Sequence, residues 1–212
     1  MGVEQIRNMN TRRGAGDNHF GVKTGDIRIL AKEIKSDPDL AQELWNTGNL
    51  EARLLALLIL KPKALTRDQV ENMVRDINFG QLAEWMSTHV LKVHPDREAM
   101  RQSWMESDHP WLSRAGWGLT ADRIPKDESG LDLNALLDRI EKEMATASEA
   151  AQWTMNFTLG NIGIHHPELR ERALAIGEQI GLYKDWPVSK GCTIPYVPVW
   201  VNEMVSRQEA AV

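Results

Sequence analysis

Apolar side chains recur every three or four residues along most of this chain, and this period constrains its fold more than any other feature. The clearest example is a stripe with charged residues opposite it: Leu131, Leu133, Leu136, Leu137, Ile140 and Met144. Side chains at this spacing share one face of an α-helix. Residues 51–60 (EARLLALLIL) are apolar nearly all round after the first turn, as expected of an inner helix flanked by neighbours. No stretch alternates with a period of two for long enough to indicate a sheet, so the sequence predicts an all-α fold.

The expected helices begin in one recurrent way, with a proline in or near the first turn and an acidic residue close by. The four cases are Asp37-Pro38-Asp39, His94-Pro95-Asp96, Asp108-His109-Pro110 and His166-Pro167-Glu168. Segments 44–57 and 103–117 also resemble each other: a tryptophan ends one helix, a polar turn follows, and the next helix carries an arginine near its start. Repeated helix–turn–helix units of roughly 30 residues are typical of an α-solenoid such as the HEAT repeats.

These patterns predict about six HEAT-like helical hairpins, forming one domain over residues 1–212 with a concave groove. Residues 1–18 are expected to be a basic arm, and residues 185–212 an ordered C-terminal loop and helix. The predicted helices lie near residues 2–13, 25–35, 38–46, 50–60, 66–76, 79–93, 96–106, 109–123, 131–144, 148–163, 167–181 and 197–208.

The net charge of −5 is unfavourable for a nucleic-acid binder, because neutralising phosphates usually supplies most of the non-specific affinity. The charge is uneven, however. Up to Lys35 there are seven Lys and Arg against four Asp and Glu, so residues 1–35 carry +3 and the remainder −8. An acidic body with a basic arm can still bind DNA on one face.

Three features predict a cytoplasmic protein that does not contact a membrane. The single cysteine, Cys192, leaves no internal disulfide and is typical of a reducing compartment. The longest apolar run, residues 54–60, is too short to cross a bilayer. The first residues, MGVEQIRNMNTRRG, lack the apolar region of a secretory signal.

Familiar catalytic and ligand-binding motifs are incomplete, so we expect no cofactor and no metal. Residues 16–24 (GDNHFGVKT) nearly spell a phosphate-binding P-loop, but Val22 separates Gly21 from Lys23 and no strand precedes the segment. The six histidines never form H-E-x-x-H, and one cysteine leaves no zinc cluster. No G-x-S-x-G is present, which argues against a nucleophile elbow.

Tryptophan is unusually frequent, with eight residues against two tyrosines and three phenylalanines. Because tryptophan buries a large area, most of these rings are expected in the core or between hairpins. A cleft that stacks on bases or sugars needs the same rings, so their number favours neither interpretation.

The segment HFGVKTGDIRILAKEIK (19–35) resembles the opening of the DNA alkylation repair family of HEAT-like proteins, the AlkD type. The resemblance continues through residues 51–62, 94–117 and 191–205 and covers nearly the whole chain in order and spacing. It implies a monomeric, concave solenoid that binds damaged double-stranded DNA. In active members of the family it also implies excision of N3- and N7-alkylated purines.

The chemistry of that reaction defines the residues to look for. An alkylated purine of this kind is positively charged, so the base leaves without a general acid. The protein must stabilise an oxocarbenium-like sugar with a carboxylate and electron-rich rings. It also needs an arginine or lysine on the adjacent phosphate. Active members of the family resemble this design, with an aspartate, an arginine and two tryptophans.

Carried over to this chain, the resemblance gives DNA-contacting positions at Arg114, Trp111, Phe157 and Phe79. Here the sequence departs from the family pattern, because Ala83 occupies the position of the decisive carboxylate. Glu84 is adjacent and Asp76 lies a turn upstream of Phe79, so either is a candidate catalytic carboxylate if the helix is rotated.

Each of these residues also has a structural interpretation. Arg114 can bridge hairpins, Phe79 and Phe157 can be core residues, and Glu84 can be a solvated helix residue. In the tail, Lys190 and Tyr196 can contact phosphate or fix the tail, the latter being favoured.

Three functions therefore stay open. The first is an alkylpurine DNA glycosylase that uses a relocated carboxylate, with Glu84 favoured. The second is a non-catalytic recogniser of unusual DNA structure, which the missing aspartate and the acidic charge favour. The third is a protein–protein scaffold, because solenoids present extended surfaces to many partners. For the DNA-binding functions we expect Arg114 on or near the concave face, in contact with phosphate.

Overall fold

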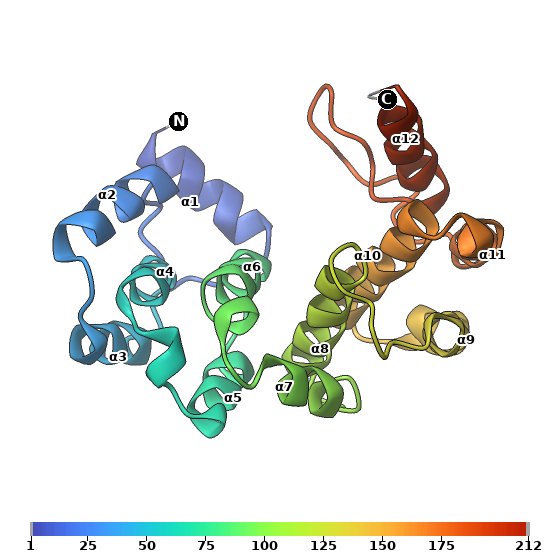
Figure 1. Ribbon diagram of the computed structural model, residues 1–212. Helices are drawn as coiled ribbons and strands as arrows, with labels where there is room; N and C mark the ends of the chain where they lie inside the picture. The colour runs from blue at the N-terminus through green and yellow to red at the C-terminus, as the bar shows by residue number, and fades with distance from the viewer. Residues whose placement is uncertain (1, 211–212) are drawn as a thin grey trace. The chain divides into compact units, whose positions relative to one another are not determined.

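The fold is that of a computed structural model in which residues 2–210 are described. Within these residues the chain forms twelve α-helices and three short 3₁₀ turns, and no strand (Figure 1). The predicted all-α fold is confirmed. Across the same residues, no helix combines the length and the apolar character needed to span a bilayer.

The helices lie close to where their sequence patterns place them. Their bounds are α1 (Val3–Arg12), α2 (Thr24–Ile34), α3 (Pro38–Asn46), α4 (Leu50–Ile59), α5 (Arg67–Arg75), α6 (Gly80–His89), α7 (Arg97–Trp104), α8 (Pro110–Arg123), α9 (Leu133–Glu143), α10 (Glu149–His165), α11 (Pro167–Ile180) and α12 (Val197–Glu209). The one clear difference is the helix predicted over 79–93. It ends at His89 because Val90 leaves the helical conformation, and a 3₁₀ turn follows at Leu91–Val93.

Local capping explains most of these boundaries. The Asp37 carboxylate accepts the backbone N–H of Leu40 with Pro38 in the first turn, and Pro110 and Pro167 open α8 and α11 in the same position. The fourth predicted proline start differs, because Pro95 precedes α7 instead of opening it.

The chain separates into two units, Met1–Ala99 and Met100–Val212, each with its own internal contacts. In the first unit α4 packs against α2, α3 and α6. In the second unit α10 is central and packs against α8, α9, α11 and α12. The single domain expected over 1–212 stays a prediction.

A buried carboxylate organises the first unit. Glu51, at the start of α4, is 6% exposed and accepts three consecutive backbone N–H groups: Phe20 at 2.9 Å, Gly21 at 2.7 Å and Val22 at 3.2 Å. Gly21 has φ +81°, and a Cβ there would lie 2.4 Å from the carbonyl oxygen of Val3. The segment that resembles a P-loop therefore does bind an anion, but the anion is a side chain of the same protein.

Hydrogen bonds from Asn18 extend the attachment of this segment to α4. The Asn18 carbonyl accepts the backbone N–H of Leu50 at 3.0 Å, and its side chain donates to the carbonyl of Thr47 at 3.2 Å. Asn49, which caps α4 through the N–H of Ala52, donates to Asn18 as well. Residues 18–22, which include the start of the segment that resembles the DNA alkylation repair family, are thus held in place by α4, about 30 residues further along the chain.

In the second unit, side chains of α10 are hydrogen-bonded to the backbone of α8. Thr154 donates to the carbonyl of Arg114 at 2.8 Å, and Asn161 donates to that of Ala121 at 2.8 Å. Between them, the hydroxyl of Thr158 lies 3.2 Å from the carbonyl of Trp117. The two helices can approach this closely because α8 has small residues at the contact: a Cβ on Gly118 would already lie 3.3 Å from Thr154.

The substitution Glu51→Gln is expected to destabilise the protein. It removes the charge and replaces one of the two acceptor oxygens by an NH₂ donor, so at least one backbone N–H loses its partner. The expected cost is about 1–3 kcal/mol in the free energy of unfolding, measured by urea denaturation. Glu43→Gln, which changes an exposed carboxylate on α3, is the control and should stay within about 0.5 kcal/mol of wild type. Equal stabilities for the two variants would show that the loop does not depend on the carboxylate.

Candidate functional site

Arg114 lies in the second unit, in the second turn of α8. The residue is 8% exposed, and its Nη1 donates to the carbonyl of Ala150 at 3.4 Å. Its guanidinium carbon lies 5.8 Å from the ring centroid of Trp111, one turn earlier on the same helix. Because Thr154 also binds the Arg114 carbonyl, α10 contacts both the backbone and the side chain of this residue.

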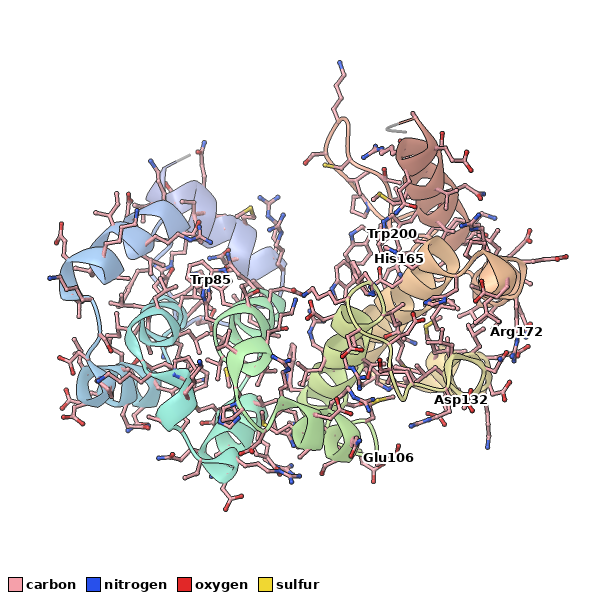
Figure 2. All side chains as sticks on the ribbon, viewed as in Figure 1. Trp85, Glu106, Asp132, His165, Arg172 and Trp200 are labelled. Atoms are coloured by element: carbon pink, nitrogen blue, oxygen red, sulfur yellow. The ribbon has the colours of Figure 1, made fainter. Side chains whose placement is uncertain are left out.

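Five aromatic rings from α10, α12 and the intervening loop pack together in the second unit. This aromatic cluster consists of Trp153, Phe157, Tyr183, Trp186 and Trp200. Figure 2 labels Trp200. Trp153 is at its centre, with ring centroids 5.2 Å from Phe157, 5.4 Å from Tyr183 and 5.5 Å from Trp186. Phe157 in turn lies 5.0 Å from Trp200. Pairs at these distances and angles add stability beyond the area that they bury.

Tyr183 connects the aromatic cluster to Arg114. Burial raises the pKa of the Tyr183 phenol to about 12, while the nearby guanidinium of Arg114 lowers that pKa and the carboxylate of Glu149 raises it. The phenol is therefore within the electrostatic range of both charged groups. Its backbone has φ +64°, a conformation that a bulky residue adopts only when its surroundings hold it there.

The loop that carries Tyr183 and Trp186, between α11 and α12, is fixed at both ends. It leaves α11 through Gly181 in the left-handed conformation, and at its far end Asn156 of α10 donates to the carbonyl of Pro195 at 2.8 Å. Trp200 then lies directly over Gly160, where a Cβ would approach its ring to 2.1 Å. The predicted order of this loop is consistent with these contacts.

Within the loop, Trp186 is the ring most open to solvent. It is 44% exposed, and Val188 beside it is 41% exposed. Lys190 is also exposed, whereas Tyr196 is buried at the start of α12 and so helps to fix the tail. Next to this accessible indole, the Tyr183 phenol is within the electrostatic range of two charges, the exposed carboxylate of Glu149 and the largely buried guanidinium of Arg114. Ring faces of this kind bind planar or cationic groups, and guanidinium binds phosphate.

The other predicted site residues belong to the first unit. Phe79 precedes α6 and is 6% exposed, and Ala83 on the same helix is also buried. Glu84 is exposed on α6. The carboxylate of Asp76 accepts the indole N–H of Trp45 at 3.4 Å and lies 3.9 Å from Nη2 of Arg53, so it links α5 to α3 and α4. Their roles in binding or catalysis stay predictions.

A second set of rings and charges lies on α2 and α6 of the first unit. The guanidinium carbon of Arg28 is 4.6 Å from the ring centroid of Trp85, which packs edge-on against His89. Burial lowers the pKa of His89, and the charge of Arg28 lowers it further. Trp85 is buried and belongs to the packing of this unit (Figure 2).

Of the DNA-contacting residues predicted from the sequence, Arg114, Trp111 and Phe157 lie in the second unit. Most of the aromatic cluster was not predicted: its tryptophans were among those expected mostly in the core or between hairpins, and Tyr183 was not singled out. The available signal was the spacing of Trp153 and Phe157, which puts both on one face of α10. Across residues 2–210, no three His, Cys, Asp or Glu side chains are grouped so that they could hold a metal ion.

Comparison with known proteins supports the resemblance seen in the sequence. A solved structure matches with a TM-score of 0.79 and 22% identity, covering 98% of this chain and 90% of the other. It is described as a new family of proteins related to the HEAT-like repeat DNA glycosylases with affinity for branched DNA structures. The match confirms the HEAT-like fold predicted from the helix pattern.

Two curated relatives come from Listeria. The uncharacterized protein Lmo0209 of Listeria monocytogenes is 25% identical over 195 residues, covering 89% of this chain and 84% of the relative. The uncharacterized protein Lin0241 of Listeria innocua is 25% identical over 192 residues, with the same coverage. In addition, the family model described as DNA alkylation repair enzyme matches residues 3–184. The chain therefore belongs to the DNA alkylation repair family.

Proposed function

We propose that the protein binds branched or otherwise distorted double-stranded DNA through the second unit, and that it excises alkylated purines weakly or not at all. The observation that carries the proposal is the aromatic cluster with its exposed Trp186 ring and with Arg114 beside Tyr183. The family membership and the affinity for branched DNA attributed to the matched structure point to the same ligand.

The rings and the arginine are suited to different parts of such a ligand. An exposed indole stacks on the face of any base that is not already stacked between its neighbours, and each such stack is worth about 1–3 kcal/mol. A guanidinium contacts phosphate without regard to sequence. Together they favour DNA with accessible bases, as at a branch point or a distortion.

The charge of the second unit supports selectivity for distorted DNA. From residue 100 onward there are eleven Lys and Arg against sixteen Asp and Glu. A unit in which acidic side chains outnumber basic ones releases few counterions from an ordinary duplex and so binds it weakly. Stacking on accessible bases then makes a larger share of the binding free energy than phosphate contacts do.

The expectation of weak excision rests on the carboxylate. Ala83 replaces the residue that the family pattern requires, Asp76 is engaged with Trp45 and Arg53, and Glu84 is exposed to solvent. Losing one electrostatic partner of a developing cation typically costs about 10²–10³ in rate.

One observation keeps glycosylase activity as a second candidate. Glu149, in the first turn of α10, is close enough to Tyr183 to raise the pKa of its phenol. Glu149 also lies one turn before Trp153 on α10, so it places a carboxylate near the aromatic cluster, where the oxocarbenium-like sugar of an alkylpurine substrate would need one.

The binding proposal is tested by fluorescence anisotropy with a three-way DNA junction and a linear duplex of equal length, over a range of salt concentrations. Wild type is expected to prefer the junction. Trp186→Ala should weaken junction binding by about 1–3 kcal/mol. Val188→Ala, which shortens an exposed side chain of the same loop, is the matched control and should bind as wild type does. Arg114→Ala should reduce the slope of log K against log salt by about one phosphate contact.

Two results would contradict this proposal. One is equal junction affinity for Trp186→Ala and wild type. The other is no DNA binding at low salt, which would instead support a scaffold that binds proteins.

Catalysis is tested by a time course of base release from methylated DNA. Wild type is expected to release N3- and N7-alkylated purines about 10²–10³ times more slowly than family members that keep the carboxylate, or not at all. Glu84→Gln, Glu149→Gln and Asp76→Asn then identify the carboxylate on which any release depends. Fast release that none of the three substitutions changes would mean that the catalytic group lies elsewhere.

A further inference from the structure

The first unit contains a cavity of about 220 Å³ between α1, residues 22–24, α4 and the start of α6. One water occupies roughly 30 Å³ in the liquid, so the cavity holds several. It is smaller than the pockets of about 300 Å³ and above that take drug-sized molecules. Its walls are largely apolar, and five polar residues border it: Asn10, Lys23, Thr24, Glu51 and Gln81.

Asn10 is the polar group that the fold does not account for. The residue lies on α1, is only 6% exposed and borders the cavity. Among residues 2–210 its side-chain amide makes no hydrogen bond, although an amide offers two donors and two acceptor lone pairs. The amide atoms stay accessible to water from the cavity, so a ligand that carries a donor and an acceptor can replace that water.

Glu51 adds one unused acceptor position. A carboxylate has about four lone-pair positions, and three of them accept the N–H groups of Phe20, Gly21 and Val22. The remaining position is on Oε2, and Glu51 borders the cavity, so it is available to a donor that reaches this oxygen. The negative charge of Glu51 is balanced by the positive charge of Lys23 in the same lining, which favours a neutral ligand. Gln81, half-buried in the first turn of α6, contributes a second amide.

We propose that this cavity binds a single nucleobase. Apolar walls suit the faces of a flat heterocycle, and side-chain amides bind a base edge that carries a donor beside an acceptor. The free position of Glu51 accepts an exocyclic amino or ring N–H group. Adenine, cytosine and guanine all meet these requirements.

The base can be a free molecule or an unstacked base of bound DNA. The second source rests on the proposed function, because it requires that the protein binds distorted DNA, in which unstacking a base costs least.

The cavity is tested by titrating the protein with adenine while the side-chain amides of Asn10 and Gln81 are observed by NMR, so that the amide of Gln81 reports on Asn10→Leu and that of Asn10 on Gln81→Leu. A saturable shift is expected in wild type. Asn10→Leu should weaken adenine binding at least tenfold, and Gln81→Leu should weaken it as well. Asn8→Leu, which removes an exposed amide from the same helix, is the control and should keep the wild-type affinity. Circular dichroism checks that each variant is folded. If Asn10→Leu does not fold, the adenine affinity of Gln81→Leu tests the proposal in its place.

The absence of a saturable shift at the Asn10 amide would overturn the proposal. The proposal would also be overturned if Asn10→Leu, or Gln81→Leu where Asn10→Leu does not fold, bound adenine as tightly as wild type does.

A second experiment distinguishes the two sources of the base. A three-way junction carries 2-aminopurine at an unpaired position, and its fluorescence rises when that base leaves the stack. If DNA supplies the base, wild type raises the fluorescence and Asn10→Leu does not. If the junction binds without a rise in 2-aminopurine fluorescence and the protein also binds adenine, the cavity binds free nucleobases. If the junction does not bind at all, the proposed function fails, and the adenine titration still decides whether the cavity binds a base.

Discussion

The candidate site depends on the hydrogen bonds that α10 makes to the backbone of α8. The carbonyl of Arg114 lies inside α8 and already accepts one backbone N–H, so Thr154 uses its second lone pair. The carbonyl of Ala121 lies in the last turn, where the residue four positions on is Pro125 and has no N–H, so Asn161 supplies its donor. Bonds of this kind form only if the helices lie very close together. They fix the register of the two helices, and that register determines where Arg114 lies relative to Trp153 and Phe157. No carboxylate is needed for this attachment.

The rest of the site is built on that helix pair at some conformational cost. Tyr183 is held in a left-handed conformation by its ring contacts with Trp153 and Trp186, and Trp200 fits only because Gly160 has no side chain. Surfaces that are rigid before binding lose less entropy when a ligand arrives. For a chain with a net charge of −5, which gains little from phosphate neutralisation, such rigidity favours ligands recognised by stacking.

Local signals in the sequence were sufficient to predict the helices and their pairing into a HEAT-like fold. Apolar period and caps such as Asp37 act within a few residues, so they can be read without tertiary information. The role of residues 18–22 could not be read in this way, because their partner Glu51 is about 30 residues away. The aromatic cluster was missed for the same reason: the path of the loop after α11 decides that Tyr183 and Trp186 reach Trp153. The substitution at Ala83, in contrast, was visible once the family pattern was laid over the sequence.

Hydrogen–deuterium exchange of the protein with and without a three-way DNA junction tests the central claim most directly, because it locates the bound surface without any substitution. The account predicts slower exchange in the loop between α11 and α12 and in the first turns of α8 and α10. It predicts unchanged exchange in α9. Protection confined to α9 and α11, or unchanged exchange in the loop while the junction is bound, would contradict the account.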